Sequence, residues 1–201
     1  MPGRSLIGLT GGIAAGKSEA LRILGELGAE TLSTDAVVHE LLDGDEVRGE
    51  LVERWGPEVV EGGRVDRSKL AGIVFEDPEE LAWLVALLHP LVGRHVAAWR
   101  EEMQTGGGGG IAVVEVPLLF EGSMAEIFDA TVAVVADDEL RRRRAETRGT
   151  DALEGRSARQ LSQDEKAARA TFVITNHGSL EQLEADLRAL LGDLRAAAAD
   201  P

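Results

Sequence analysis

Residues 11–18, Gly-Gly-Ile-Ala-Ala-Gly-Lys-Ser, match the pattern G-x-x-x-x-G-K-[ST]. Glycines let the backbone curl so that several N–H groups point at phosphate oxygens, and a helix beginning near Gly16 adds the positive end of its dipole. Lys17 would reach the β- and γ-phosphates of a nucleotide, and the Ser18 hydroxyl would bind Mg²⁺. An apolar run at residues 6–10 precedes the motif and a leucine-rich helical pattern follows it, which is the strand–loop–helix order that a P-loop requires.

Short apolar runs alternate with helical patterns along the rest of the chain. Runs typical of strands buried on both faces lie at residues 6–10, 29–32, 111–116, 130–136 and 172–175. Strands that alternate with helices predict a parallel sheet covered by helices on both faces, an α/β fold. We expect a single domain whose parts are a core (about 1–42, 106–136 and 170–198), a helical subdomain (about 43–105) and a lid (about 137–169).

One expected helix has clear start and stop signals. In Asp77-Pro78-Glu79-Glu80, Asp77 can cap the helix, Pro78 suits its first position and Glu80 can complete a capping box. Pro90 should break or kink this helix.

Composition excludes several function classes. The 201 residues are 44% hydrophobic, enough for one domain with a core, and the net charge of -15 excludes a uniform basic coat for nucleic acid. There are no cysteines, so disulfides and thiolate metal sites are excluded. No stretch approaches the roughly 20 apolar residues of a membrane span, and no secretory leader precedes the motif, so we expect a cytoplasmic protein without membrane contact. Among 21 basic residues only Lys17, Lys69 and Lys166 are lysines, which makes a lysine at a demanding position informative.

Two carboxylates lie where a parallel sheet places its ligands. Asp35 follows the second strand and could take a proton from an attacking hydroxyl, or it could cap the helix over residues 36–42. Glu115 lies within a buried strand, where a carboxylate is costly unless a cation is near. It could approach the Mg²⁺ bound at Ser18, or it could pair with an arginine at the strand end.

An arginine cluster stands out in an acidic chain. Its members are Arg141, Arg142, Arg143, Arg144 and Arg148. Helical spacing puts Arg141, Arg144 and Arg148 on one face, where they could clamp a polyphosphate as a closing lid, or form a solvated face paired with acids.

The chain resembles the dephospho-coenzyme A kinase family over residues 6–194. The resemblance rests on Ile7-Gly8-Leu9-Thr10-Gly11-Gly12-Ile13 running into Gly16-Lys17-Ser18, on Thr34-Asp35, on Leu87-Leu88-His89-Pro90-Leu91-Val92 and on Val116-Pro117-Leu118-Leu119-Phe120-Glu121. A weaker stretch runs from Gln160-Leu161 through Lys166 to Val173-Ile174 and Asn176-His177-Gly178. The P-loop is common to many families, whereas the Leu-His-Pro and Pro-Leu-Leu-Phe-Glu segments are far more specific.

The resemblance implies a three-layer α/β/α P-loop fold with a five-stranded parallel sheet, a helical substrate-binding subdomain and an arginine-rich lid. It implies transfer of the γ-phosphate of ATP, with Mg²⁺, to the ribose 3′-hydroxyl of dephospho-CoA, with Asp35 as general base. Nucleotide contacts would come from Gly12, Ile13, Ala14, Ala15, Gly16, Lys17, Ser18, Glu19, Asn176 and Gly178. Acceptor contacts would come from Thr10, Asp35, His89, Pro90, Pro117, Leu118, Leu119, Phe120 and Glu121. Ser18 and Glu115 would bind the metal.

The chain departs from the family pattern at three places. Ser33 replaces the first acid of an Asp-x-Asp pair, which leaves Asp35 as the carboxylate there. Glu19 replaces the second hydroxyl residue of the usual Ser-Thr pair and is expected to point along its helix. The lid spacing aligns only with a gap, so Arg144 or Arg148 could act on the transferring phosphoryl group, with Arg148 preferred because Gly149 follows it.

Other functions fit less well. A nucleoside or nucleotide kinase would share the P-loop, the acid after strand two and the arginine lid, but it would not explain the two specific segments. A GTPase would usually carry Asn-Lys-x-Asp and Asp-x-x-Gly motifs, and the sequence has neither in the required place. Binding of nucleic acid through the arginine cluster is disfavoured by the acidic charge and by the lack of aromatic residues near the cluster. The sequence leaves the oligomeric state open.

Overall fold

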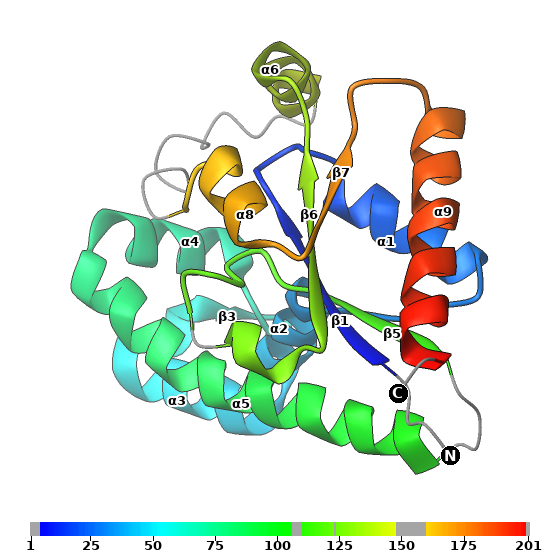
Figure 1. Ribbon diagram of the computed structural model, residues 1–201. Helices are drawn as coiled ribbons and strands as arrows, with labels where there is room; N and C mark the ends of the chain where they lie inside the picture. The colour runs from blue at the N-terminus through cyan, green and yellow to red at the C-terminus, as the bar shows by residue number, and fades with distance from the viewer. Residues whose placement is uncertain (1–4, 106–109, 123, 148–159, 200–201) are drawn as a thin grey trace. The chain divides into compact units, whose positions relative to one another are not determined.

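The computed structural model describes residues 5–105, 110–122, 124–147 and 160–199 (Figure 1). Its contacts divide the chain into two units. Unit 1 comprises Met1–Ser33 and Trp99–Pro201, and unit 2 comprises Thr34–Ala98.

Unit 1 is built on a five-stranded sheet in which every pairing is parallel, as the alternation of strands and helices predicts. The strand order is β2-β5-β1-β6-β7, so β1, which leads into the P-loop, is central. The strands span β1 Ser5–Gly11, β2 Glu30–Ser33, β5 Ile111–Glu115, β6 Ala130–Val135 and β7 Phe172–Thr175. The carboxyl ends of these strands meet at one edge of the sheet, where ligands bind in open α/β folds.

Helices cover both faces of this sheet, which confirms the α/β fold expected. Helices α1 (Lys17–Glu26) and α9 (Leu180–Ala199) pack against a buried apolar cluster that includes Ile7 and Leu9 of β1. On the opposite face Gly8 lies against Leu119 and Phe128, and α8 (Gln163–Arg169) contacts β1 and β6. Unit 1 also contains η2 (Met124–Ile127) and α6 (Asp138–Thr147).

Unit 2 has its own core. It holds α2 (Thr34–Asp43), α3 (Asp45–Trp55), η1 (Pro57–Val59), the hairpin β3 (Val60–Glu61) and β4 (Arg64–Val65), α4 (Arg67–Glu76) and most of α5 (Pro78–Thr105). Leu51, Val59, Val65 and Leu70 belong to its buried apolar cluster, and the hairpin is antiparallel.

Helix α5 runs without interruption through Pro90, so Pro90 does not break the helix, and the alternative of a kink stays a prediction. Buried Leu84, Leu88, Val92 and Val96 continue at helical spacing on both sides of Pro90. Their packing offsets the single backbone hydrogen bond that proline removes.

The same helix corrects the expectation that no stretch resembles a membrane span. Among the described residues, α5 is the one helix long and apolar enough for that by length and composition, with 22% of its most apolar window buried. One such helix is weak evidence, because helices of ordinary soluble proteins pass the same test. Leu84 and Leu88 of α5 belong to the apolar cluster of unit 2, which gives part of the helix's apolar character a packing role.

Candidate active site

The P-loop has the backbone geometry of an anion-binding cradle. Between β1 and α1, Ala14 (φ 59°) and Gly16 (φ 100°) are left-handed, and successive N–H groups in such a conformation point inward as a nest. A Cβ added to Gly11 would lie 2.2 Å from the carbonyl oxygen of Val134, and one added to Gly16 would lie 2.2 Å from Nδ2 of Asn176. Glycine is therefore required at both positions, by backbone conformation and by space.

Lys17, the first residue of α1, lies beside this cradle. Its Nζ donates a hydrogen bond to the carbonyl oxygen of Gly12 at 3.0 Å. The ammonium group is thus held against the loop whose N–H groups would bind phosphate oxygens. This is the position that the motif predicts for a lysine that neutralises phosphate charge.

Glu115 connects the P-loop helix to the end of β2. Its side chain is buried, and its Oε1 and Oε2 accept hydrogen bonds of 3.2 Å from the hydroxyls of Ser18 and Ser33 respectively. Ser33 thus occupies the place where the family pattern has an acid and uses its hydroxyl to hold Glu115.

The donor set at Ser18 and Glu115 fits Mg²⁺. Both residues offer oxygen atoms, the ligands that Mg²⁺ prefers, and they lie within hydrogen-bond distance of each other. No cluster of three His, Cys, Asp or Glu side chains suited to a metal occurs in the described part of the chain. That is compatible with Mg²⁺, which usually keeps several waters and binds one or two protein groups together with substrate phosphates.

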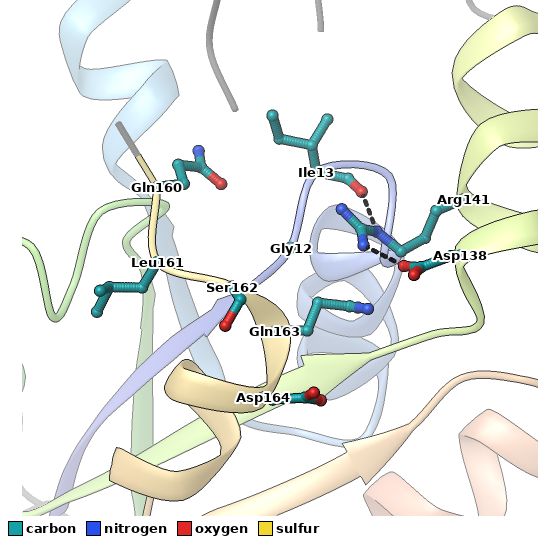
Figure 2. Close-up of a pocket in the computed structure, with 9 residues that line it drawn as sticks. All are labelled: Gly12, Ile13, Asp138, Arg141, Gln160, Leu161, Ser162, Gln163 and Asp164. Atoms are coloured by element: carbon teal, nitrogen blue, oxygen red, sulfur yellow. Dashed lines mark hydrogen bonds and ion pairs between the residues drawn. The ribbon is translucent and has the colours of Figure 1, made fainter. Parts of the chain in front are cut away.

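Two arginines of α6 reach the P-loop. Arg141 Nε donates to the carbonyl oxygen of Ile13 at 2.9 Å, and its Nη1 bonds Asp138 at 2.7 Å (Figure 2). Arg144 Nη2 lies 3.5 Å from Asn176 Oδ1, and Arg144 Nη1 is buried without a hydrogen-bond partner among the described residues. A buried guanidinium nitrogen without a partner is costly, so it indicates a place for an acceptor from a ligand. Arg148 lies outside the described residues.

A pocket of about 250 Å³ opens above the loop. Figure 2 shows Ile13 and Arg141 on one side of it and the segment that enters α8 on the other. Its lining residues are Gly12, Ile13, Asp138, Arg141, Gln160, Leu161, Ser162, Gln163 and Asp164. The pocket joins the phosphate cradle to both helices of the expected lid region.

Asn176, just past β7, supports the loop. It is buried, and its Nδ2 donates to the carbonyl oxygen of Ala15 at 2.8 Å. Gly178, two residues on, is exposed in the same connection to α9. Glu19 points along α1 and accepts a hydrogen bond from Arg22 at 2.6 Å, as expected.

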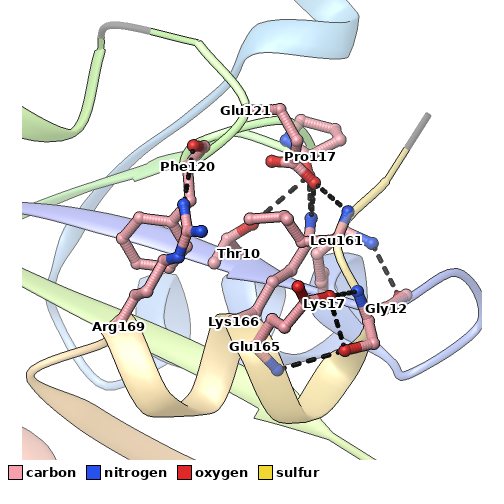
Figure 3. Close-up of polar contacts among 11 residues, drawn as sticks. Thr10, Gly12, Lys17, Pro117, Phe120, Glu121, Leu161, Glu165, Lys166 and Arg169 are labelled. Carbon is pink, nitrogen blue, oxygen red and sulfur yellow. Dashed lines mark hydrogen bonds and ion pairs between the residues drawn. The ribbon is translucent and has the colours of Figure 1, made fainter.

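The segment after β5 forms a second polar cluster (Figure 3). The carbonyl oxygen of Pro117 accepts from Lys166 Nζ at 2.5 Å and from Thr10 Oγ1 at 3.3 Å. Glu121 Oε1 accepts from Leu161 N at 2.8 Å and lies 3.0 Å from Lys166 Nζ. Burial lowers the pKa of Lys166, and the hydrogen bond and charge of Glu121 act in the opposite direction.

The apolar residues of this segment differ in what they can touch. Leu118 is exposed, whereas Leu119 is completely buried against Gly8 and presents no surface to a ligand. Phe120 is half-buried, and its carbonyl oxygen accepts from Arg169.

Three predicted site residues lie in unit 2. Asp35 is exposed in the first turn of α2, which begins at Thr34, so Asp35 is inside the helix and is not its N-cap. His89 and Pro90 are exposed on α5.

Sequence reasoning missed three residues at the P-loop site. Arg141 was expected on one helix face with Arg144 and Arg148, but its contact with the backbone of Ile13 spans 128 positions of sequence and has no local signal. Gln163 exchanges two hydrogen bonds with the backbone of Ala136, and neither is visible in a local pattern. Lys166 could have been suspected from the rarity of lysine in this chain.

Comparison with known proteins agrees with this geometry. A family model described as dephospho-CoA kinase matches residues 5–182. The dephospho-CoA kinase of Deinococcus radiodurans is 44% identical over 191 residues, which cover 94% of this chain and 91% of the relative. A solved structure of a Thermus thermophilus protein matches with a TM-score of 0.78 and 36% identity, covering 96% of this chain and 98% of the other. The dephospho-CoA kinase of Campylobacter jejuni matches with a TM-score of 0.67 and 25% identity, covering 95% and 97%.

Proposed function

The chain belongs to the dephospho-CoA kinase family, and from that membership we propose that it transfers the γ-phosphate of ATP to the ribose 3′-hydroxyl of dephospho-CoA. The observation that carries the proposal is the P-loop cradle with Lys17 beside it and the Ser18–Glu115 pair at its helix end. These groups are suited to holding a nucleoside triphosphate by its phosphates.

The transfer is an in-line displacement at phosphorus. The 3′-hydroxyl oxygen forms a bond to the γ-phosphorus while the bond from that phosphorus to the β–γ bridging oxygen breaks, and ADP leaves. Asp35 accepts the proton of the attacking hydroxyl. Its exposed carboxylate follows β2, the strand beside β5.

Positive charge stabilises the transferring group. Lys17 acts between the β- and γ-phosphates, and the buried, unpartnered Nη1 of Arg144 supports its assignment as the lid arginine in the described part of the chain. Arg148 remains the alternative for this role. Arg141 has a different part, because it binds the backbone of Ile13 and so maintains the shape of the cradle.

Ser18 and Glu115 would hold Mg²⁺, which would supply positive charge to the phosphates. Ser18 would supply its hydroxyl to the ion, and Glu115 would orient that hydroxyl through its hydrogen bond.

Asn176 and Gly178, which follow β7, would contact the adenine. Pro117, Leu118, Phe120, Glu121 and, in unit 2, His89 and Pro90 would contact the acceptor.

An acceptor panel tests the proposal against a nucleoside or nucleotide kinase. The protein is incubated with magnesium-ATP and either dephospho-CoA, adenosine, AMP or pantetheine, and ADP is measured. Among these four acceptors, we expect rapid ADP formation only with dephospho-CoA. Faster turnover of adenosine or AMP would assign the chain a different acceptor.

A further inference from the structure

Lys166 is the most deeply buried charged side chain in the described part of the molecule. Its relative exposure is 0%, and it is one of the largest side chains that are fully buried. Lysine is almost never fully buried unless it is paired, because removing an ammonium group from water is costly. Nothing in the phosphoryl-transfer scheme above uses Lys166, so its burial needs a reason of its own.

The contacts of Lys166 join three parts of unit 1. The residue belongs to α8, and its Nζ bonds the carbonyl oxygen of Pro117 and the carboxylate of Glu121 in the segment after β5. The same carbonyl accepts from Thr10, one residue before the P-loop. Figure 3 shows these groups converging on one point between α8, the end of β1 and the segment 117–121.

Only one of the two carboxylate oxygens of Glu121 has a hydrogen-bond partner among the described residues. Its Oε1 accepts from Leu161 N and lies 3.0 Å from Lys166 Nζ. Its Oε2 is buried and has no hydrogen-bond partner among the described residues. A buried carboxylate oxygen left without a donor is costly, so a ligand that supplies a donor would explain it.

The chemistry of that ligand group follows from charge. A carboxylate repels phosphate, so Oε2 is unsuited to the phosphates of either substrate and suited to a neutral O–H or N–H donor. Glu121 follows β5, which lies beside β2, whereas Asn176 and Arg144 follow β7 and β6 on the other side of β1. Glu121 and the proposed adenine contacts thus follow strands on different sides of β1 in the sheet order.

We infer that Lys166 is a positioning residue for the acceptor: it fixes the segment 117–121 so that Glu121 Oε2 accepts a hydrogen bond from a hydroxyl or amide of dephospho-CoA. The inference rests on the proposed function. Lys166 acts through Glu121 and Pro117 and does not itself touch substrate. Its ion pair with Glu121 holds the segment against α8, and its bond to the carbonyl oxygen of Pro117, which also accepts from Thr10, ties the segment to the P-loop strand.

Steady-state kinetics of Lys166→Met test this assignment, with Lys69→Met as the matched control. Lys69 is an exposed lysine paired with Glu61 and Asp66, so the control makes the same chemical change away from the cluster. We expect Lys166→Met to raise the KM for dephospho-CoA about tenfold or more, the loss of one charge-assisted hydrogen bond, with a much smaller change in the KM for ATP. Lys69→Met should change neither. An unchanged KM for dephospho-CoA in a folded Lys166→Met enzyme would overturn the inference.

A double variant separates positioning from stability. Removing one partner of a buried pair leaves an unbalanced charge, whereas replacing both is often neutral for folding. Lys166→Met with Glu121→Gln should therefore fold even if the single variant does not. We expect the double variant to keep the weakened binding of dephospho-CoA, measured by calorimetry without ATP, although its melting temperature returns towards wild type. Recovery of binding together with stability would show a purely structural role.

The wild-type enzyme is measured first. If it binds ATP but does not phosphorylate dephospho-CoA, the proposed function fails. If it does so and Lys166→Met behaves like wild type, only the role of Lys166 fails.

Discussion

At the level of single residues, the P-loop lysine has the clearest predicted effect. Lys17 lies 3.0 Å from the carbonyl oxygen of Gly12, beside the cradle for phosphate. Lys17→Ala should lower turnover by about 10²–10⁴, the usual loss on removing one preorganised charge from an active site. Circular dichroism should be unchanged. Lys69→Ala is the control, and turnover of Lys17→Ala near that of the control would exclude Lys17 from the reaction.

Substitution of different arginines of α6 should change different kinetic parameters. Arg144 has a buried nitrogen without a partner among the described residues, so Arg144→Ala should lower kcat, by about 10³ if it acts as an arginine finger. Arg141→Ala should mainly raise the KM for ATP, because Arg141 holds the backbone of Ile13. Exposed Arg143, paired with Glu139, provides the control variant Arg143→Ala.

Arg148→Ala is measured beside these variants, and a larger kcat loss in Arg148→Ala than in Arg144→Ala would move the lid role to Arg148. If no arginine variant changes turnover by more than about threefold, far below the effect of an arginine finger, this helix is only a solvated face.

Asp35→Asn tests the proposed base. Asn keeps the size of the side chain but cannot take a proton, so turnover should fall by about 10²–10⁴ while ATP affinity is retained. The melting temperature should change little, because Asp35 is exposed in the first turn of α2 and loses only a weak interaction with the helix dipole. Asp45→Asn, in the first turn of α3, controls for that effect. A fully active Asp35→Asn enzyme would remove Asp35 from the mechanism.

At the level of elements, the sequence predicts those parts that depend on neighbouring residues. The five strands, the P-loop turn and the start of α5 follow from apolar runs, glycines and capping residues. Asp77 caps the first turn of α5 as predicted, through a 2.8 Å bond from the N–H of Glu79. Glu80 instead bonds Arg54 and Trp55, which lie about 25 positions away, so a tertiary contact replaces the predicted capping box.

The contact of Glu80 should make the stability of unit 2 depend on pH. The hydrogen bond from Arg54, followed by that from Trp55, lowers the pKa of Glu80 below its ordinary value of 4.5. A carboxyl with a lowered folded-state pKa stabilises the fold above its unfolded pKa, and this contribution is lost as the pH falls through the folded pKa. The melting-temperature difference between wild type and Glu80→Gln should therefore shrink from pH 7 to pH 3. Exposed Glu79→Gln is the control, and a Glu80→Gln difference that does not vary with pH would contradict this account.

At the level of the whole molecule, the site depends on contacts that no local pattern encodes. Lys166 meets Pro117 across 49 positions and Asn176 meets Ala15 across 161. Both contacts follow from the strand order β2-β5-β1-β6-β7, which brings the segments after β1, β5, β6 and β7 to one edge of the sheet. The motif sequence identifies the chemistry of the P-loop, but the sheet order selects which distant side chains support it.

The reaction proposed here is transfer of the γ-phosphate of ATP to the ribose 3′-hydroxyl of dephospho-CoA. Its most direct test is the position of the transferred phosphate. Wild-type protein is incubated with magnesium-ATP and dephospho-CoA, and the product is examined by phosphorus NMR and mass spectrometry. We predict one new phosphomonoester on the ribose 3′-oxygen, formed in equal amount with ADP. ADP released without a new phosphoester, or phosphate on any other hydroxyl, would contradict the account.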